Sequence, residues 1–198
     1  MTDRVFKHSH AHKLEDPERL KWLPPAEVLS RLNLAQGGKV ADVGAGTGYF
    51  AVPIARAVGD SGHVQAIDLQ QEMLDPLRQK LDRPDAPKNI SLHAGSVSQL
   101  PLRDDSVDLA FYANIWHELY DEAAAFLEAV RVAQPNASIA ILDWRSDRKS
   151  PPGPTQGHRI PAESIVNFLQ KSGCRRVACS NIGEFSYLVT AELPATRS

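Results

Sequence analysis

The stretch from Lys39 to Phe50 constrains the fold of this chain more than any other. Residues 39–43 form a short apolar run typical of a buried strand, and Gly44, Gly46 and Gly48 follow it at alternating positions. The residues after the third glycine have the composition of a helix start. Glycine accepts positive φ and lets a ligand approach the backbone closely. A strand, a glycine turn and a helix in this order bring backbone N–H groups and the positive helix end to one point, which predicts a site for a nucleotide-type ligand.

The spacing of these glycines indicates which nucleotide binds. A dinucleotide-binding turn has the pattern G-x-G-x-x-G, whereas here the pattern is Gly44-x-Gly46-x-Gly48, which is one residue shorter. Asp42 stands two residues before the first glycine, where its charge would repel a pyrophosphate and attract an ammonium or a sulfonium. The alternative is an ordinary strand–turn–helix connection without a ligand, which the entropic cost of three glycines makes unfavourable.

Composition places the chain among single-domain α/β proteins. It has 198 residues, 42% of them hydrophobic, and a net charge of −2, which predicts neither a nucleic-acid partner nor attraction to a membrane. No apolar run is long enough to span a bilayer, and residues 1–13 lack the apolar core of a signal peptide. Cys174 and Cys179 have an odd separation in an expected strand, so they should face opposite sides and stay unpaired. We therefore expect a cytoplasmic protein.

Alternating strand and helix patterns predict a parallel sheet covered on both faces. The last two strands are joined by a turn so short that they must be antiparallel neighbours. The expected strands cover residues 39–43, 63–69, 89–94, 107–113, 137–143, 174–180 and 185–193. The expected helices cover residues 26–32, 49–58, 70–81, 121–132 and 161–172.

Polar side chains are expected where the parallel strands end, because ligands bind at the carboxyl edge of such sheets. Asp68 ends the second strand, where it would either grip the hydroxyl groups of a ribose or cap the helix over 70–81. Met73 would lie either against an adenine or in the core. His117 follows the fourth strand and is the best candidate for a general base, because its pKa can lie near neutrality. Its alternative role is to orient the helix over 121–132.

The fifth strand and the loop after it contribute further candidates. Asp143, Trp144 and Arg145 fall at the ligand edge, where they would contact a substrate unless the two charges form a solvated pair. Residues 146–160 are rich in proline and glycine and too long for an ordinary connection, which predicts a lid or specificity loop. Basic side chains would give this loop a cationic rim and favour an anionic substrate; they are Arg148, Lys149, His158 and Arg159.

The N-terminus carries no assigned chemistry. Residues 1–13 are expected to form a mobile arm, and residues 14–198 a single domain. His8, His10 and His12 alternate within the arm. A solvated tail is the simpler interpretation for the first two, while binding a metal and reaching over the site are the alternatives. Because a metal site needs more ligands held by rigid structure, we expect no metal.

Together these motifs resemble those of the class I S-adenosylmethionine-dependent methyltransferases, in particular methyltransferase domain type 11, a group that includes ubiquinone and menaquinone pathway enzymes. The resemblance extends from about Glu15 to Leu193 and is carried by Val40–Gly48, Ala66–Asp68, Leu100–Pro101 and Asn114–Leu119. It implies an α/β fold with a Rossmann-like doubly wound sheet of seven strands, order 3-2-1-4-5-7-6, strand 7 antiparallel and helices on both faces. It also implies that residues 14–38 form a helical cover over the cofactor.

The resemblance assigns cofactor-binding roles along the strand ends. The glycine turn and Asn114 would contact the methionine part of S-adenosylmethionine, with Asp42 near its cationic end. In the family an acid usually receives the adenine amino group after the third strand, whereas here Ser96 stands at that place and accepts more weakly. The expected cofactor-binding residues are Asp42, Gly44, Ala45, Gly46, Thr47, Gly48, Asp68, Leu69, Met73, Ser96, Val97 and Asn114.

The implied function is methyl transfer from S-adenosylmethionine to a small-molecule acceptor by in-line displacement, with His117 as the base for a phenol, amine or hydroxyl. The expected pocket has no cysteines of the kind that arsenite methyltransferases use, which disfavours that branch. Two alternatives stay open. One is a nicotinamide-dependent oxidoreductase, disfavoured by the glycine spacing and Asp42, and the other is a non-catalytic cofactor-binding member of the fold. The sequence does not name the acceptor, and it leaves a homodimer open.

Overall fold

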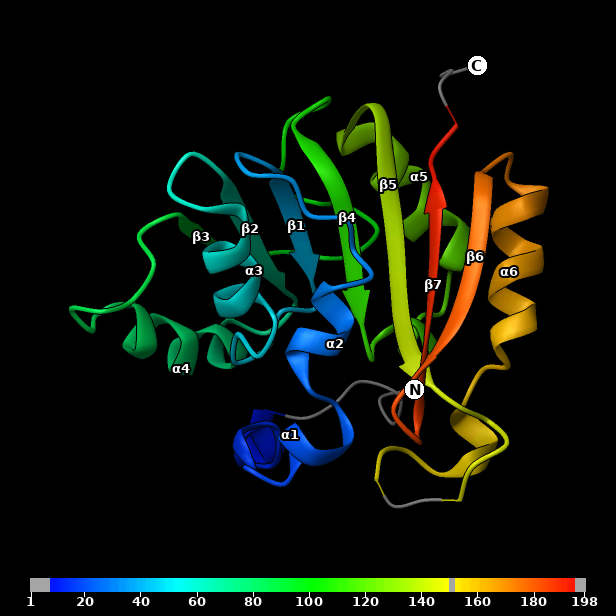
Figure 1. Cartoon of the computed structure of the whole chain (residues 1–198), viewed down its shortest axis with the longest axis horizontal. Coiled ribbons are helices and arrows are strands. Elements are labelled where there is room, and N and C mark those ends of the chain that lie inside the picture. Colours follow the sequence, from blue (N-terminus) through cyan, green and yellow to red (C-terminus); the bar gives the residue numbers. More distant parts are fainter. Residues whose placement is uncertain (1–7, 150–151, 195–198) are drawn as a thin grey trace.

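The computed structural model describes residues 8–149 and 152–194, and its centre is one sheet of seven strands (Figure 1). The strand order is β3-β2-β1-β4-β5-β7-β6, and β7 runs antiparallel to both neighbours while the other pairs are parallel. The strands are β1 (Lys39–Val43), β2 (His63–Asp68), β3 (Ile90–Ala94), β4 (Val107–Ala113), β5 (Ala133–Trp144), β6 (Arg175–Ile182) and β7 (Ser186–Glu192). The predicted fold class and strand order are confirmed.

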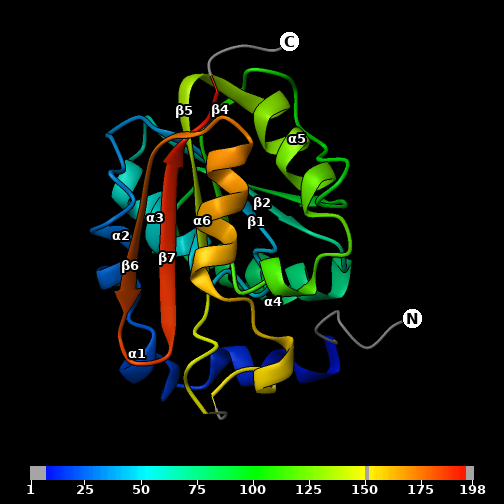
Figure 2. The ribbon, with the colours of Figure 1, turned by 90° about the vertical axis from the view of Figure 1, so that its right-hand side faces the viewer.

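Helices cover both faces of this sheet, with α5 and α6 on one side and α2 and α3 on the other (Figure 2). Each of the longer helices turns an apolar stripe toward the strands, as the helical spacing of its buried residues requires. The α-helices are α1 (Arg19–Trp22), α2 (Pro25–Leu29), α3 (Ala51–Val58), α4 (Gln71–Leu81), α5 (Glu122–Val132) and α6 (Ala162–Lys171). Within the described ranges the 3-10 helices are η1 (His8–Glu15), η2 (Trp116–Glu118) and η3 (Gln156–His158).

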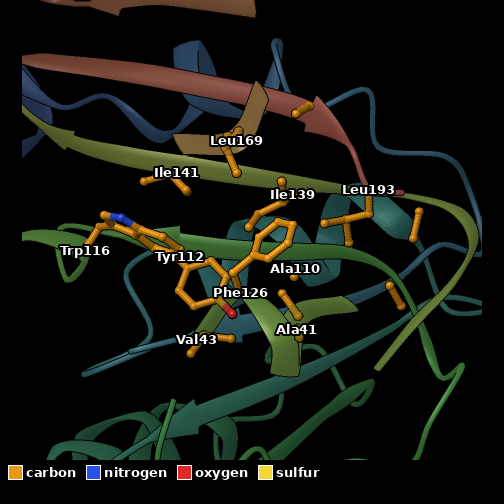
Figure 3. Close-up of a cluster of buried hydrophobic side chains, with 14 of the residues drawn as sticks. Ala41, Val43, Ala110, Tyr112, Trp116, Phe126, Ile139, Ile141, Leu169 and Leu193 are labelled. Carbon is orange, nitrogen blue, oxygen red and sulfur yellow. The ribbon is translucent and has the colours of Figure 1, made fainter. Parts of the chain in front are cut away.

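The central strand β4 is apolar on both sides. Ala110 and Tyr112 belong to the buried cluster under α5 and α6, where Phe126 of α5 lies across the strands (Figure 3). Leu109 and Phe111 belong to the cluster on the opposite face. This pattern is typical of a parallel strand buried between two helical layers. Packing on both faces fixes the carboxyl end of β4, and it therefore also fixes the position of the residues that follow β4.

Strand β5 is longer than the sequence predicts. It begins at Ala133, directly after α5, instead of at residue 137. The reason is that Ala133 already pairs with Val107 of β4, and the register then shifts before Leu109 pairs with Ser138. Asn136 takes a positive φ of 66° at this irregularity, which asparagine tolerates better than most residues.

Part of the predicted N-terminal arm is ordered as η1. Residues 1–7 lie outside the described residues, as do the side chains of His10 and His12, so the predicted mobility of the arm stays a prediction. Residues 150–151, in the long loop after β5, also lie outside the described residues. Cys174 is buried, Cys179 is exposed, and both are free thiols, as predicted. Among the described helices, none has the length and apolarity that crossing a membrane requires.

Candidate functional site

The glycine turn after β1 packs tightly against two other parts of the chain. Gly44, Gly46 and Gly48 have φ values of 76°, 53° and 83°, in the region that favours glycine. A Cβ atom on Gly44 would lie 2.6 Å from a side-chain carbon of Ile115, and one on Gly48 would collide with Leu77 of α4. The outer glycines are therefore required by packing. Only Gly46 would place a Cβ at ordinary contact distance from its neighbours.

The N–H groups of the turn form hydrogen bonds within the protein. Gly44 and Ala45 both donate to the carbonyl of Ile67, at 2.8 and 2.9 Å. Gly46 donates to Oδ2 of Asp68 at 2.9 Å. This differs from the expectation that the turn presents its N–H groups to a ligand. A phosphate group would find these three donors already in use, whereas a ligand that needs only close approach to the backbone would not.

Asp68 links the glycine turn to the start of α4. Besides the bond from Gly46, its Oδ1 accepts the N–H of Gln70 at 3.0 Å. Burial raises the pKa of Asp68, although the backbone hydrogen bonds oppose that shift. The carboxylate keeps further lone pairs for hydroxyl donors. Leu69, the next residue, is 59% exposed and offers an apolar surface beside it.

The end of β3 lies next to the end of β2, as the sequence predicts. Asp68 pairs with Ala94 in the sheet, so Ser96 and Val97 follow close by. The hydroxyl of Ser96 shares a hydrogen bond of 2.9 Å with that of Ser98. Met73 is buried, and its terminal methyl lies against Gly46, a place that suits a core methionine. Its contact with an adenine stays a prediction.

Asp42 is a buried carboxylate without a cationic contact. It is 1% exposed, the N–H of Ala51 donates to it, and its Oδ2 has no hydrogen-bond partner among the described residues. Burial, together with the charge of Asp68, raises the pKa of Asp42 to about 7. A positively charged group placed nearby would stabilise the ionised form of a buried carboxylate that has no cationic contact. The structure thus retains the feature that made Asp42 a candidate.

Asn114 holds an uncommon backbone conformation at the end of β4. Its φ is 58°, its N–H donates to the carbonyl of Leu142 at 2.7 Å, and its side-chain Oδ1 has no partner among the described residues. Left-handed backbone at a non-glycine residue often marks a functional site. Ile115, which follows, packs on Gly44. The structure therefore brings Asn114 to the glycine turn.

His117 is held by Asp143 through two hydrogen bonds. Its Nδ1 lies 2.8 Å from Oδ1 of Asp143, and its backbone N–H donates to Oδ2 at 3.0 Å. The Asp143 side chain is fully buried, and the His117 side chain is 7% exposed. Since a carboxylate accepts but does not donate, Nδ1 carries the proton and Nε2 is the basic nitrogen of the neutral ring. Burial works to lower the pKa of His117, but the hydrogen bond and charge of Asp143 outweigh it and raise the pKa.

The loop after β5 differs from its prediction in two ways. Asp143 forms no solvated pair with Arg145, which instead pairs with Asp147 at 2.7 Å. Arg159 is 5% exposed and belongs to no cationic rim. Its guanidinium donates to the carbonyls of Arg145, Arg148, Pro152 and Pro154, so it holds the loop together from inside. The sequence could not reveal this, because the acceptors are backbone atoms.

Sequence reasoning also missed three contacts that join the N-terminal segment to the site. Lys80 of α4 donates to the carbonyl of Thr47 at 2.9 Å and to the carboxylate of Glu15 at 2.8 Å. Trp22 of α1 lies 5.3 Å from Trp144 at the end of β5, measured between ring centroids. Arg19 of α1 lies over the ring of Tyr49. No local pattern announces these pairs, since each joins distant segments. Among the described residues, no His, Cys, Asp and Glu side chains are grouped to hold a metal ion.

Comparison with known proteins identifies the family. A family model described as a methyltransferase domain matches residues 40–136. The crystal structure of a SAM-dependent methyltransferase from Aquifex aeolicus is similar with a TM-score of 0.89 and 32% sequence identity, covering 96% of this chain and 100% of that chain. The chain belongs to the class I S-adenosylmethionine-dependent methyltransferases, whose cofactor is S-adenosylmethionine.

Two curated relatives have different acceptors in their names. An arsenite methyltransferase of Halobacterium salinarum is 30% identical over 110 residues, which are 56% of this chain and 28% of that protein. A demethylmenaquinone methyltransferase of Lactobacillus johnsonii is 30% identical over 162 residues, which are 82% of this chain and 63% of that protein. The chain thus spans only part of the length of these relatives. Both are methyltransferases, and they leave the acceptor open.

Proposed function

We propose that this protein transfers the methyl group of S-adenosylmethionine to a small-molecule acceptor, with His117 as the general base. The observation that carries the proposal is the buried His117–Asp143 pair at the end of β4. It stands two residues beyond Ile115, whose side chain packs on Gly44 of the glycine turn. A base and a turn that accepts close approach thus share one edge of the sheet, where ligands of doubly wound folds bind.

The residues present fit the cofactor. Near the turn, Asp42 and Asn114 offer acceptor oxygens that have no partner among the described residues, as the positively charged end of S-adenosylmethionine requires. Asp68 would hold the ribose hydroxyls, and Leu69 with Val97 would border the adenine. When bound, the cofactor supplies a methyl group that its positively charged sulfur has already activated. The remaining task of the protein is to align a nucleophile with that methyl group and to exclude water, and positioning alone is worth about 7–11 kcal/mol of barrier.

His117 would take a proton from the acceptor at Nε2. Asp143 fixes the ring through Nδ1 and stabilises the imidazolium that forms, so the base is oriented before the acceptor binds. This arrangement suits an acceptor whose nucleophilic atom carries a proton, namely a phenol, a hydroxyl or an amine. A soft nucleophile such as arsenite needs no base and is usually received by thiolates. Neither Cys174, at the opposite edge beside the start of β6, nor the exposed Cys179 of β6 is placed to do so.

Two other functions are less well supported. A nicotinamide-dependent oxidoreductase would place a pyrophosphate on the glycine turn, where three N–H groups already donate within the protein. Burying a His–Asp pair costs desolvation free energy. A cofactor-binding protein without catalysis would have no use for such a pair. Among phenols, a quinol-type acceptor is the first candidate to test, because one relative is a demethylmenaquinone methyltransferase.

Further parts of the proposal rest on the sequence. They are the cytoplasmic location, the homodimer, the cover by residues 14–38 and the role of residues 146–160 as a specificity loop. The contacts of Lys80 with Glu15 and Thr47 support the cover, because they fasten the N-terminal segment to the glycine turn. The four carbonyls gathered by Arg159 favour a preformed loop over a freely moving lid.

The test is an acceptor screen with methyl-labelled S-adenosylmethionine, run on the unmodified protein and on His117→Ala. We expect label to enter a phenol, hydroxyl or amine acceptor with the unmodified protein and far more slowly with the variant. Calorimetry with S-adenosylmethionine, NAD and NADP on the same sample decides between the cofactors. Binding of NAD or NADP in preference to S-adenosylmethionine would overturn the proposal.

A further inference from the structure

Arg19 is a buried cation at the glycine turn. It is the first residue of α1, and it is 6% exposed. Its guanidinium carbon lies 3.9 Å above the ring centroid of Tyr49, the residue directly after Gly48. Its Nη1 donates to the carbonyl of Leu14 at 3.2 Å. Leu14 in turn lies against Gly46, so these contacts place the guanidinium beside the turn.

The charge of Arg19 has no direct counterpart in the described part of the chain. No carboxylate forms an ion pair with it, and its Nε has no hydrogen-bond partner there. The acidic residue nearest in sequence on η1, Glu15, is bound by Lys80. Burial lowers the pKa of Arg19 to about 10, so the side chain keeps its proton at neutral pH. A buried guanidinium normally has an anion or several acceptors around it, and here one carbonyl accepts from Nη1 while Nε is buried without a partner among the described residues.

Unused acceptors lie around the same turn. Asp42 Oδ2 and Asn114 Oδ1 are buried without partners among the described residues. Asp42 and Arg19 influence each other electrostatically but form no ion pair. A free amino-acid group carries one carboxylate and one ammonium, and it needs a cationic donor on one side and oxygen acceptors on the other. Arg19 on α1 and the pair of acceptors at the ends of β1 and β4 offer that arrangement.

We infer that Arg19 binds the α-carboxylate of the methionine part of S-adenosylmethionine. The inference rests on the proposed function, since it takes the glycine turn to be the cofactor site. It gives α1 a direct part in cofactor recognition, although no local motif marks the residue. The competing interpretation is that Arg19 only stacks on Tyr49 and braces η1. In that case the charge is incidental, and an apolar side chain of similar length would serve.

The experiment compares two ligands that differ in the amino-acid end. S-adenosylhomocysteine carries the carboxylate and the ammonium, whereas 5′-methylthioadenosine has the same nucleoside and sulfur without either. Calorimetry gives the Kd of both for the unmodified protein, Arg19→Met, Arg19→Lys and the control Arg31→Met, which alters an exposed arginine beyond α2. We expect Arg19→Met to weaken the binding of S-adenosylhomocysteine by about tenfold or more, because a charge-assisted pair is lost. The Kd of 5′-methylthioadenosine should stay unchanged. The Kd of Arg19→Lys for S-adenosylhomocysteine should lie between those of the unmodified protein and Arg19→Met, because lysine keeps the charge and lacks the planar guanidinium.

Several outcomes would overturn the inference. Equal weakening of both ligands would show a structural role for Arg19, and an unchanged Kd for S-adenosylhomocysteine would show no role in binding. If Arg19→Met does not fold, as judged by its thermal unfolding, the ratio of the two Kd values in Arg19→Lys decides in the same way. Failure of the unmodified protein to bind either ligand would overturn the proposed function itself. Decarboxylated S-adenosylmethionine, which keeps the ammonium, should bind the unmodified protein and Arg19→Met alike. A loss there would assign Arg19 to something other than the cofactor carboxylate.

Discussion

Backbone groups hold the glycine-turn side of the site, which comprises Asp42–Gly48 and Asp68. Neighbouring carbonyls and one carboxylate receive its N–H groups. Side chains from distant segments hold the histidine side, which comprises His117, Asp143 and Arg159. There the decisive contact joins residues 26 positions apart in the chain. The difference implies that substitutions on the first side should change cofactor affinity, whereas substitutions on the second should change turnover.

The largest effect is expected from His117→Ala. Loss of a general base lowers kcat by about 10²- to 10⁴-fold, and the Kd for S-adenosylmethionine should stay unchanged because Asn114 and Ile115 keep their places. Single-turnover rates and calorimetry measure the two quantities. His63→Ala, at the start of β2 and far from the site, is the matched control. Equal kcat values for the two variants would remove His117 from the chemistry.

Gly46→Val should act on the other side of the comparison. A Cβ at this position would lie 3.4 Å from Leu14 and 3.5 Å from Met73, so the fold should survive. The added methyl groups should fill the space that a ligand needs to approach the backbone, and valine is strained at this positive φ. Together these changes should weaken the binding of S-adenosylmethionine by about 100-fold or more. Calorimetry and circular dichroism measure affinity and fold. The control is Gly157→Ala, whose added Cβ would meet no atom of the described residues within 4 Å, and tight binding by Gly46→Val would take the turn out of the site.

Asp143→Asn should alter the pH dependence of turnover. Asp143 raises the pKa of His117, and a base works only when neutral, so kcat should be lost as pH falls through that raised pKa. Without the charge the inflection should move to lower pH, with kcat reduced by about tenfold. The kcat–pH profile provides the measurement, and Asp60→Asn, in an exposed turn, should leave the profile in place. An unmoved inflection in Asp143→Asn would separate Asp143 from the base.

Asp68→Ala tests the ribose contact. Losing two hydrogen bonds to the ribose should weaken S-adenosylmethionine by about tenfold, with kcat at saturation nearly unchanged. Calorimetry measures the Kd, and Asp75→Ala, an exposed acid on α4, controls for the loss of negative charge. If the affinity of Asp68→Ala equals that of the control, Asp68 serves only the turn and the start of α4.

The smallest effect concerns stability. The folded-state pKa of Asp42 is about 7, above its unfolded value of 3.8, so its ionisation destabilises the cofactor-free protein increasingly as pH rises from about 4 to 7. Asp42→Asn should therefore raise the Tm of the cofactor-free protein at about pH 8, by about 2–4 °C for each kcal/mol gained. The gain should shrink toward pH 4, and binding of S-adenosylmethionine should weaken. Scanning calorimetry at both pH values checks the sign, and a lower Tm at high pH would contradict it.

The sequence predicts the glycine-turn side better than the histidine side. Alternating glycines after a strand impose a turn by local sterics, and the position of Asp68 follows from strand order alone. The sequence predicts that His117 and Asp143 each lie at the ligand edge, but their pairing depends on the approach of β4 and β5. The sequence predicts a cationic rim that includes Arg159, because composition does not tell a buried guanidinium from an exposed one. The carbonyl acceptors of Arg159 exist only once the loop is folded.

The same reasoning explains why the contacts of Arg19 in the N-terminal segment escaped prediction, although a helical cover formed by residues 14–38 is expected. Arg19 gives no signal in a polar stretch, since its contacts with Leu14 and Tyr49 form only after α1 settles on the turn. Expected helices and strands matched to within a few residues, because their apolar spacing is local. What decides chemistry here is a small number of buried charges, and burial is a property of the whole fold.

A crystal structure with S-adenosylhomocysteine tests the central claim most directly. We expect the ligand along the glycine turn beside Gly46, with its ribose hydroxyls on Asp68 and its sulfur directed toward the space in front of His117. Density for S-adenosylhomocysteine at any other place would contradict the account. So would crystals in which S-adenosylhomocysteine leaves the turn empty while NAD binds there.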